Sequence, residues 1–298
     1  PAFVAARDDG LLRRASEVAL TASYLCTAVL YDLAGAKGWL ARHAELVPLL
    51  PEARLNHGYY AGLVADFAGD LGAAQRTYEV HIGMARAMGL YSELAEALSA
   101  LGVLRGRIGD VVGAERAFGE LIALDDKISS SARALALHNA AWVALEARAR
   151  GQAASDPEPQ LVAAAAIFAP DGLRPDALLA AETRLSLVYA KLVRGDVAGA
   201  RSDLAGLLTP TRTLRRWKDY LAAQADLLGG DLPAALHGFA VVAKDASEAG
   251  DRSLEWSVAV GAGEAFERLG RVEDALDRYR VAAAIHGSDI ERLAIDAG

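Results

Sequence analysis

One short pattern recurs along this chain of 298 residues: an apolar stretch, a turn that begins with Gly, and a second apolar stretch with an alanine near its start. The turns follow one another at intervals of 40, 86, 35 and 40 residues, and the gap of 86 has room for two units. A repeat of this length predicts stacked helical hairpins, because one hairpin cannot bury its apolar faces alone. The turn pairs are Gly69-Asp70, Gly109-Asp110, Gly195-Asp196, Gly230-Asp231 and Gly270-Arg271.

The residues on either side of each turn predict close packing within a hairpin. An alanine stands five residues after every turn glycine, and its methyl group lets two helices approach closely. A large apolar residue follows one helical turn later and fills the space beside the crossing. Three turns are also preceded, at seven residues, by another glycine. These positions are Ala74, Ala114, Ala200, Ala235 and Ala275; Tyr78, Phe118, Leu204, Phe239 and Tyr279; and Gly62, Gly102 and Gly263.

Composition agrees with an all-α fold. Hydrophobic residues make up 53% of the chain, which is enough for a large core, and good helix formers fill nearly every segment. We therefore expect seven helical hairpins. The predicted helices are 10–33, 36–47, 52–68, 71–88, 91–108, 111–126, 130–150, 158–168, 174–194, 197–208, 211–228, 232–249, 252–269 and 272–286.

The order of small residue, turn, alanine and aromatic resembles the tetratricopeptide repeat (TPR), and its spacing is similar to the 40-residue variant of kinesin light chains and bacterial regulatory arrays. The resemblance extends over 53–286, although the usual early tryptophan and closing proline are missing. It implies a right-handed α-solenoid that forms a single array over 1–298, with a divergent N-terminal hairpin at 1–50. Proline and glycine in 151–176 predict a loop insertion or bend in the middle repeat, and a boundary between two half-solenoids there remains an alternative.

Charge and cysteine content exclude several classes of function. The net charge of −8 leaves no basic surface for nucleic acid or for an anionic membrane. The longest uncharged stretch near the start, 18–31, is too short to span a bilayer, and no secretory signal precedes it. The single cysteine, Cys26, excludes an internal disulfide and fits a small core residue in a reducing compartment. We therefore expect a cytoplasmic protein.

Enzyme signatures are missing from the sequence. There is no phosphate-binding GxxxxGK[ST] loop, no HExxH, no GxSxG and no paired CxxC, and the six histidines stand apart from one another. We therefore predict no catalytic residues, no cofactor and no metal site.

A TPR-like array presents a concave groove lined by the first helix of each hairpin. The residues expected there are unusually polar and aromatic, and they form the candidate partner-binding site. In the TPR family an asparagine at the position of Asn139 often hydrogen-bonds the backbone of a bound peptide, and the context "LHNAAWVAL" resembles that site; a bond between helices is the alternative. Trp142 and Trp217 fit either anchors for a partner or core residues. The candidate residues are Asn56, Tyr59, Asp66, Arg107, His138, Asn139, Trp142, Glu146, Tyr189, Trp217, Tyr220 and Gln224.

The sequence therefore favours a scaffold that binds a protein or peptide in this groove. The array resembles those attached to CHAT proteases or STAND-type regulators, which implies a regulatory or sensor part of a larger bacterial signalling protein, with a possible effector domain in the same chain. A small-molecule or peptide-signal sensor that closes on its ligand is the alternative, and an enzyme is the least favoured one. The residues 285–298 suggest the start of a further helix.

Overall fold

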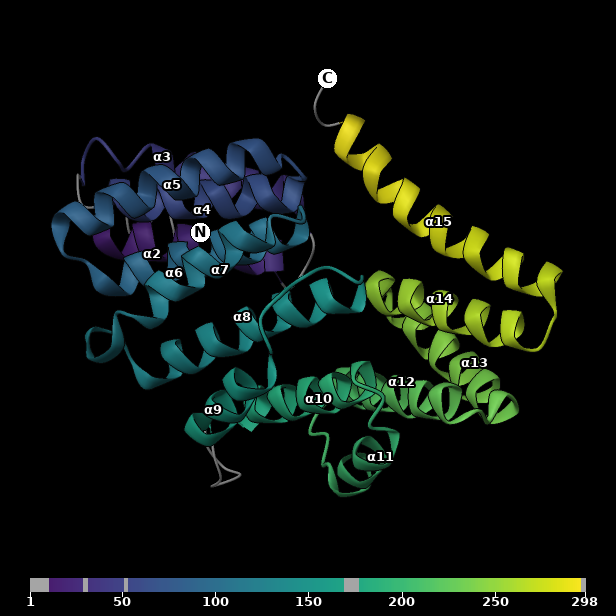
Figure 1. Cartoon of the computed structure of the whole chain (residues 1–298). Coiled ribbons are helices and arrows are strands. Elements are labelled where there is room, and N and C mark those ends of the chain that lie inside the picture. Colours follow the sequence, from purple (N-terminus) through teal and green to yellow (C-terminus); the bar gives the residue numbers. More distant parts are fainter. Residues whose placement is uncertain (1–10, 29–31, 51–52, 169–176, 296–298) are drawn as a thin grey trace. The chain divides into compact units, whose positions relative to one another are not determined.

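The computed structural model describes residues 11–28, 32–50, 53–168 and 177–295 (Figure 1). Within these residues there are fourteen α-helices and one 3₁₀ helix, and no strand. The chain divides into two compact units, Pro1–Asn139 with Leu293–Gly298 and Ala140–Arg292. No helix among the described residues combines the length and hydropathy that a membrane crossing requires.

The first unit consists of consecutive antiparallel hairpins in which each helix from α2 to α7 packs on the next (Figure 1). The helices α4 and α6, which are two apart along the chain, also contact each other. The elements are α2 (Leu12–Ala28), α3 (Leu33–Ala44), α4 (Ala53–Ala68), α5 (Leu71–Met88), α6 (Tyr91–Arg107), α7 (Val111–Ile122), η1 (Asp125–Lys127) and α8 (Ser130–Ala149), which continues into the second unit.

The second unit repeats this arrangement, with α10 in contact with α12 and α12 in contact with α14. One apolar core runs from α10 to α14 and includes the fully buried Phe239 and Leu254. The elements are α9 (Glu158–Phe168), α10 (Ala177–Val193), α11 (Val197–Gly206), α12 (Arg212–Gly229), α13 (Leu232–Ala249), α14 (Arg252–Arg268) and α15 (Val272–Ile295).

The recurrent Gly-Asp pair is a helix stop followed by a helix start. Gly69 has a φ of 81°, in the left-handed region that glycine adopts without steric cost. The next residue, Asp70, accepts a hydrogen bond from the backbone N–H of Ala73 and so caps α5. The same cap recurs at Asp110, Asp196 and Asp231. The pair fixes where one helix ends and the next begins.

The glycine that precedes three of the turns allows a close helix crossing, as the sequence predicts. A Cβ atom at Gly102 would lie 2.6 Å from the ring of Phe118, and Gly62 and Gly263 stand equally close to the rings of Tyr78 and Tyr279. Each pair joins the two helices of one hairpin. The hairpin register read from the sequence is therefore confirmed.

A pair of histidines, of which His43 is buried and His57 half-buried, joins α2, α3 and α4. His43 in α3 hydrogen-bonds Ser16 in α2 through Nε2 at 2.7 Å, and its Nδ1 lies 3.1 Å from Nδ1 of His57 in α4. The two imidazole rings stack with centroids 5.3 Å apart. Burial, with a contribution from His57, lowers the pKa of His43 to about 4, so the pair is neutral near pH 7.

The predicted helices agree with the observed ones to within a few residues, except at the two ends of the chain. The predicted helix 10–33 is too long, because α2 ends at Ala28 and α3 begins at Leu33; residues 29–31 lie outside the described part of the chain. The sequence suggested that a helix ends near residue 286 and another begins, whereas α15 continues without a break to Ile295. One glycine, Gly287, does not stop it, because a single glycine costs only about 1 kcal/mol in a helix interior. Within 151–176, the structure describes an irregular segment and then α9 from Glu158; residues 169–176 lie outside the described part of the chain.

Candidate functional site

The candidate residues lie on α4, α6, α8, α10 and α12. We call these helices, together with α14, the first helices of their hairpins. Within each unit these helices contact one another across consecutive hairpins. Side chains at matching positions are therefore brought side by side. Each unit carries its own group of such side chains.

In the first unit, Tyr59, Ser99 and Asn139 occupy the same position of α4, α6 and α8, 40 residues apart. The amide Nδ2 of Asn139 donates a hydrogen bond to Ser99 Oγ at 3.2 Å. This bond fixes the plane of the amide. The carbonyl oxygen of the Asn139 side chain has no partner among the described residues, so it remains available as an acceptor.

An ion pair ties the same surface together at the ends of its helices. Asp66 near the end of α4 accepts a hydrogen bond from Arg107 at the end of α6. Burial raises the pKa of Asp66, and the neighbouring guanidinium opposes that rise. Both predicted residues are therefore engaged with each other, across adjacent hairpins.

Tyr59 is half-buried and serves partly as packing. Its ring meets that of Tyr60 edge-on, with centroids 5.4 Å apart, and lies near the rings of Tyr78 and His81. Burial raises the pKa of Tyr59 well above its usual value, and the carboxylate of Glu96 on α6 adds to the rise. The phenol stays protonated and able to donate.

In the second unit, a polar cluster spans four first helices. Tyr220 is buried on α12, and its hydroxyl oxygen accepts a hydrogen bond from Gln224 Nε2 at 3.0 Å. Burial raises the pKa of Tyr220 to about 12, and its electrostatic neighbours include Glu146 of α8 and Glu264 of α14. Tyr189 on α10 has the same Glu146 as a neighbour, and burial raises its pKa too. The cluster thus combines two phenols, one amide and two carboxylates.

The carboxylates of this cluster are balanced at its edge by arginines. Glu264 pairs with Arg268 at 2.5 Å, and Glu146 lies 3.6 Å from Arg150. Burial raises the pKa of Glu146, which indicates that this carboxylate is poorly solvated. Glu182 on α10 is exposed and has no ion-pair partner among the described residues.

The other predicted residues divide between surface and core. Asn56 is exposed on α4, whereas His138 is buried, at 7% exposure, and cannot line an open groove as predicted, because it faces the interior of the hairpin stack. Trp142 packs against Tyr189 with ring centroids 5.9 Å apart, and Trp217 meets Tyr220 edge-on at 5.7 Å. Both tryptophans are half-buried against apolar clusters.

Sequence reasoning missed two residues that complete these groups. Ser99 orients Asn139, and Ser257 of α14 hydrogen-bonds Tyr220. Serine is common on helix surfaces, so neither residue attracts notice alone. The signal for Ser99 is the period itself, since it lies 40 residues from both Tyr59 and Asn139.

The chemistry available is hydrogen bonding and aromatic contact. The described residues contain no group of three or more His, Cys, Asp or Glu side chains that could hold a metal ion. Amide, hydroxyl and carboxylate groups fixed on neighbouring helices are suited to recognising the backbone and side chains of a bound chain.

The sequence matches no protein-family model, and no curated protein matches it. Among solved structures, the chain is similar to a Rap protein complexed with Competence and Sporulation Factor, with a TM-score of 0.65 and 13% identity over 88% of this chain and 72% of that chain. It is also similar to the apo form of RapI, with a TM-score of 0.67 and 10% identity over 93% of this chain and 99% of that chain. Both neighbours are TPR-like helical-repeat solenoids, so the predicted all-α solenoid class is confirmed.

Proposed function

We propose that this chain binds a peptide, or an extended segment of a protein, along its first helices. The observation that carries the proposal is the row formed by Tyr59, Ser99 and Asn139, in which the amide of Asn139 is oriented by Ser99 and keeps its carbonyl oxygen unpaired. An oriented amide is a good partner for a peptide backbone, because little side-chain entropy is lost when the ligand binds.

In the first unit, the side-chain carbonyl of Asn139 would accept a hydrogen bond from a backbone N–H of the bound segment. Glu96, exposed on α6 near Tyr59, would face a basic or N-terminal group of the same segment. The ion pair of Asp66 with Arg107 would hold α4 and α6 in register beneath it. Each role follows from the chemistry of the group and from its place on a first helix.

In the second unit, the cluster around Tyr220 would bind a peptide segment with its own set of groups. Glu146 and Glu264 would accept hydrogen bonds from N–H groups, and the half-buried Trp142 and Trp217 would supply apolar contact area. Because the arginines at the edge are already paired with these carboxylates, a cationic group on the ligand would compete with them.

The proposal can be tested by selecting ligands from a phage-displayed library of random dodecapeptides on the purified chain. Peptides that the library yields would then be titrated by fluorescence anisotropy against the native chain and against Asn139→Ala. We expect the substitution to weaken binding by about tenfold, the effect of one lost hydrogen bond in a desolvated contact. Ser99→Ala should weaken binding less, because Asn139 keeps its carbonyl.

Gln75→Ala is the matched control. Gln75 is also a half-buried amide with one side-chain hydrogen bond, to Glu79 at 3.0 Å, but it lies on the second helix α5. The Gln75→Ala variant should bind the selected peptides with the same affinity as the native chain. A library that yields no peptide, or peptides that bind Asn139→Ala and the native chain equally, would contradict the proposal.

We further propose that peptide binding regulates a larger bacterial signalling protein, in which the array acts as a sensor that closes on its ligand. A specific observation favours a sensor: one of the two solved structures that the chain resembles was determined in complex with Competence and Sporulation Factor. Small-angle X-ray scattering with and without a selected peptide tests it. A radius of gyration that falls on binding is expected for a sensor, and an unchanged radius points to a rigid scaffold.

A further inference from the structure

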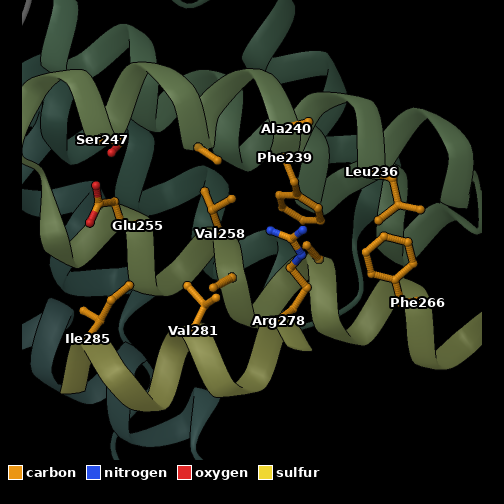
Figure 2. A pocket seen from close by; sticks show the side chains of 13 residues that line it. Leu236, Phe239, Ala240, Ser247, Glu255, Val258, Phe266, Arg278, Val281 and Ile285 are labelled. Carbon is orange, nitrogen blue, oxygen red and sulfur yellow. The ribbon is translucent and has the colours of Figure 1, made fainter. Parts of the chain in front are cut away.

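An apolar groove of about 400 Å³ lies in the second unit between α13, α14 and α15 (Figure 2). Its α14 side is formed by Val258, Ala259, Ala262 and Phe266. The polar cluster around Tyr220 contributes no residue to the groove, since Glu146, Tyr189, Tyr220, Gln224 and Glu264 all lie outside its lining. The groove is therefore separate from the surface proposed above for peptides.

The groove can be compared with the same three-helix arrangement in the first unit, because α5, α6 and α7 start 161 residues before α13, α14 and α15. The comparison explains why the groove is hollow. Ile82, Leu98 and Leu101 are buried in the core of the first unit. The residues at the same positions of the second unit are Ala243, Ala259 and Ala262, so three large side chains are replaced by methyl groups.

The ion pairs at the rim of the three-helix arrangement also differ between the two units. In the first unit, Arg86 pairs with Glu120 at 2.5 Å and Arg105 with Glu79 at 3.0 Å, and these pairs bridge α5 to α7 and α6 to α5. The matching residues in the second unit are Ser247 with Val281, and Phe266 with Ala240, none of which can form an ion pair. The second unit therefore lacks three large side chains and both ion-pair bridges of the first, although Val258 stands where the first unit has Ala97.

Two charged residues face the groove, and neither has a partner among the described residues. Arg278 projects from α15 towards Phe239, where the first unit has the buried Ala117 (Figure 2). Glu255 stands towards the other end, near Ile285, where the first unit has the buried Leu94 (Figure 2). An anionic group is attracted to Arg278 and repelled from the Glu255 end. The charges therefore favour one orientation of an anionic ligand.

We propose that this groove is a binding site for an amphiphilic anion, a molecule with an aliphatic chain and one carboxylate. The carboxylate pairs with Arg278, and the chain lies against Phe239, Ala262 and Phe266. The volume falls in the range of about 300–1,000 Å³ that is usual for small-molecule sites. An arginine at an apolar surface suits a carboxylate, because the guanidinium donates hydrogen bonds in a planar fork. This inference does not rest on the proposed peptide binding.

The probe is dodecanoate, titrated into the intact chain below its critical micelle concentration by isothermal calorimetry. We expect one saturable site, weaker binding of dodecan-1-ol and the weakest binding of dodecylammonium. Arg278→Gln should weaken dodecanoate binding by about tenfold. The double substitution Ala259→Leu with Ala262→Leu, which introduces residues found at the same positions of the first unit, should abolish it.

Matched controls separate the site from general effects. Arg280→Gln removes a neighbouring arginine that is paired with Asp277, and Ala222→Leu adds the same side chain at an exposed position of α12. Both should bind dodecanoate as the native chain does. Far-UV circular dichroism checks the fold of every variant. Arg278→Gln changes an exposed residue, so this variant still tests the proposal if the double variant does not fold.

Three results would overturn the proposal: no saturable binding of dodecanoate, equal affinity for dodecylammonium, or equal affinity of Arg278→Gln and the native chain. A dimer detected by light scattering that the double substitution dissociates would assign the groove to a second copy of the chain instead. Asn139→Ala should bind dodecanoate normally, so the outcome here is distinguishable from that of the peptide experiment.

Discussion

Replacement of Gly102 by alanine tests the close helix crossing on which the hairpin register depends. The added Cβ would meet three ring atoms of Phe118 at 2.6, 2.8 and 2.9 Å, all shorter than an ordinary van der Waals contact. Phe118 is only 1% exposed and cannot move aside freely. Overpacking of this kind costs about 1–3 kcal/mol, and the better helix propensity of alanine returns about 1 kcal/mol. We expect a net loss of up to about 2 kcal/mol.

The assay is urea unfolding followed by circular dichroism, with Gly83→Ala as the control. Gly83 also lies inside a helix, α5, but an added Cβ there would meet nothing within 4 Å. Gly83→Ala should therefore raise stability by about 1 kcal/mol. Adding Phe118→Leu to Gly102→Ala should cost less than the two single changes together, because the smaller side chain makes room for the methyl group. If Gly102→Ala is as stable as Gly83→Ala, the crossing is looser than the distances indicate.

Three further outcomes follow from other parts of the structure. Ala114→Leu should lower the thermal unfolding midpoint, at a cost of about 1–3 kcal/mol, because Ala114 is fully buried at a helix crossing; an unchanged midpoint would show that the site has room. Asn139→Ala should leave the midpoint within about 0.5 kcal/mol of the native value while weakening peptide binding; the reverse would make Asn139 structural. The unfolded chain binds a proton at His43 near pH 6.5 and the folded chain only near 4, so this histidine should lower stability as the pH falls through that window. Midpoints measured against pH should show a shallower fall in His43→Gln, and equal slopes would exclude this contribution.

The helices and their boundaries could be predicted because local chemistry determines them. The left-handed glycines and the aspartate caps stand at the turns themselves, so Gly230 and Asp231 mark the end of α12 and the start of α13 without knowledge of the rest of the fold. The small residues at the helix crossings could also be predicted, because the aromatic residues that they contact lie at a fixed spacing along the same hairpin. The sequence predicted the end of α15 poorly, because the helix continues past Gly287 to Ile295.

The candidate site was less predictable, because it depends on how far each side chain is covered by its neighbours. His138 and Asn139 are adjacent in sequence and both polar, yet one is buried and the other is half-buried and bonded to Ser99. Adjacent residues on a helix point about 100° apart, so an error of one position moves a residue from surface to core. Tyr220 illustrates the same difficulty, since it is buried although its hydroxyl takes part in the polar cluster.

Positions at which equivalent residues of the two units differ indicate features that hairpin formation alone does not explain. Gly102 and Gly263 are equivalent and identical because both hairpins need the same close crossing. Leu98 and Ala259 are equivalent and different, and nothing in hairpin formation requires the change. A cavity lined by apolar groups lowers stability in proportion to its volume unless something fills it. The alanines that stand in the second unit where the first has Ile82, Leu98 and Leu101 are therefore the observation on which the proposed ligand of the groove rests. The departures from the repeat, more than its consensus, are where the function of a helical array should be sought.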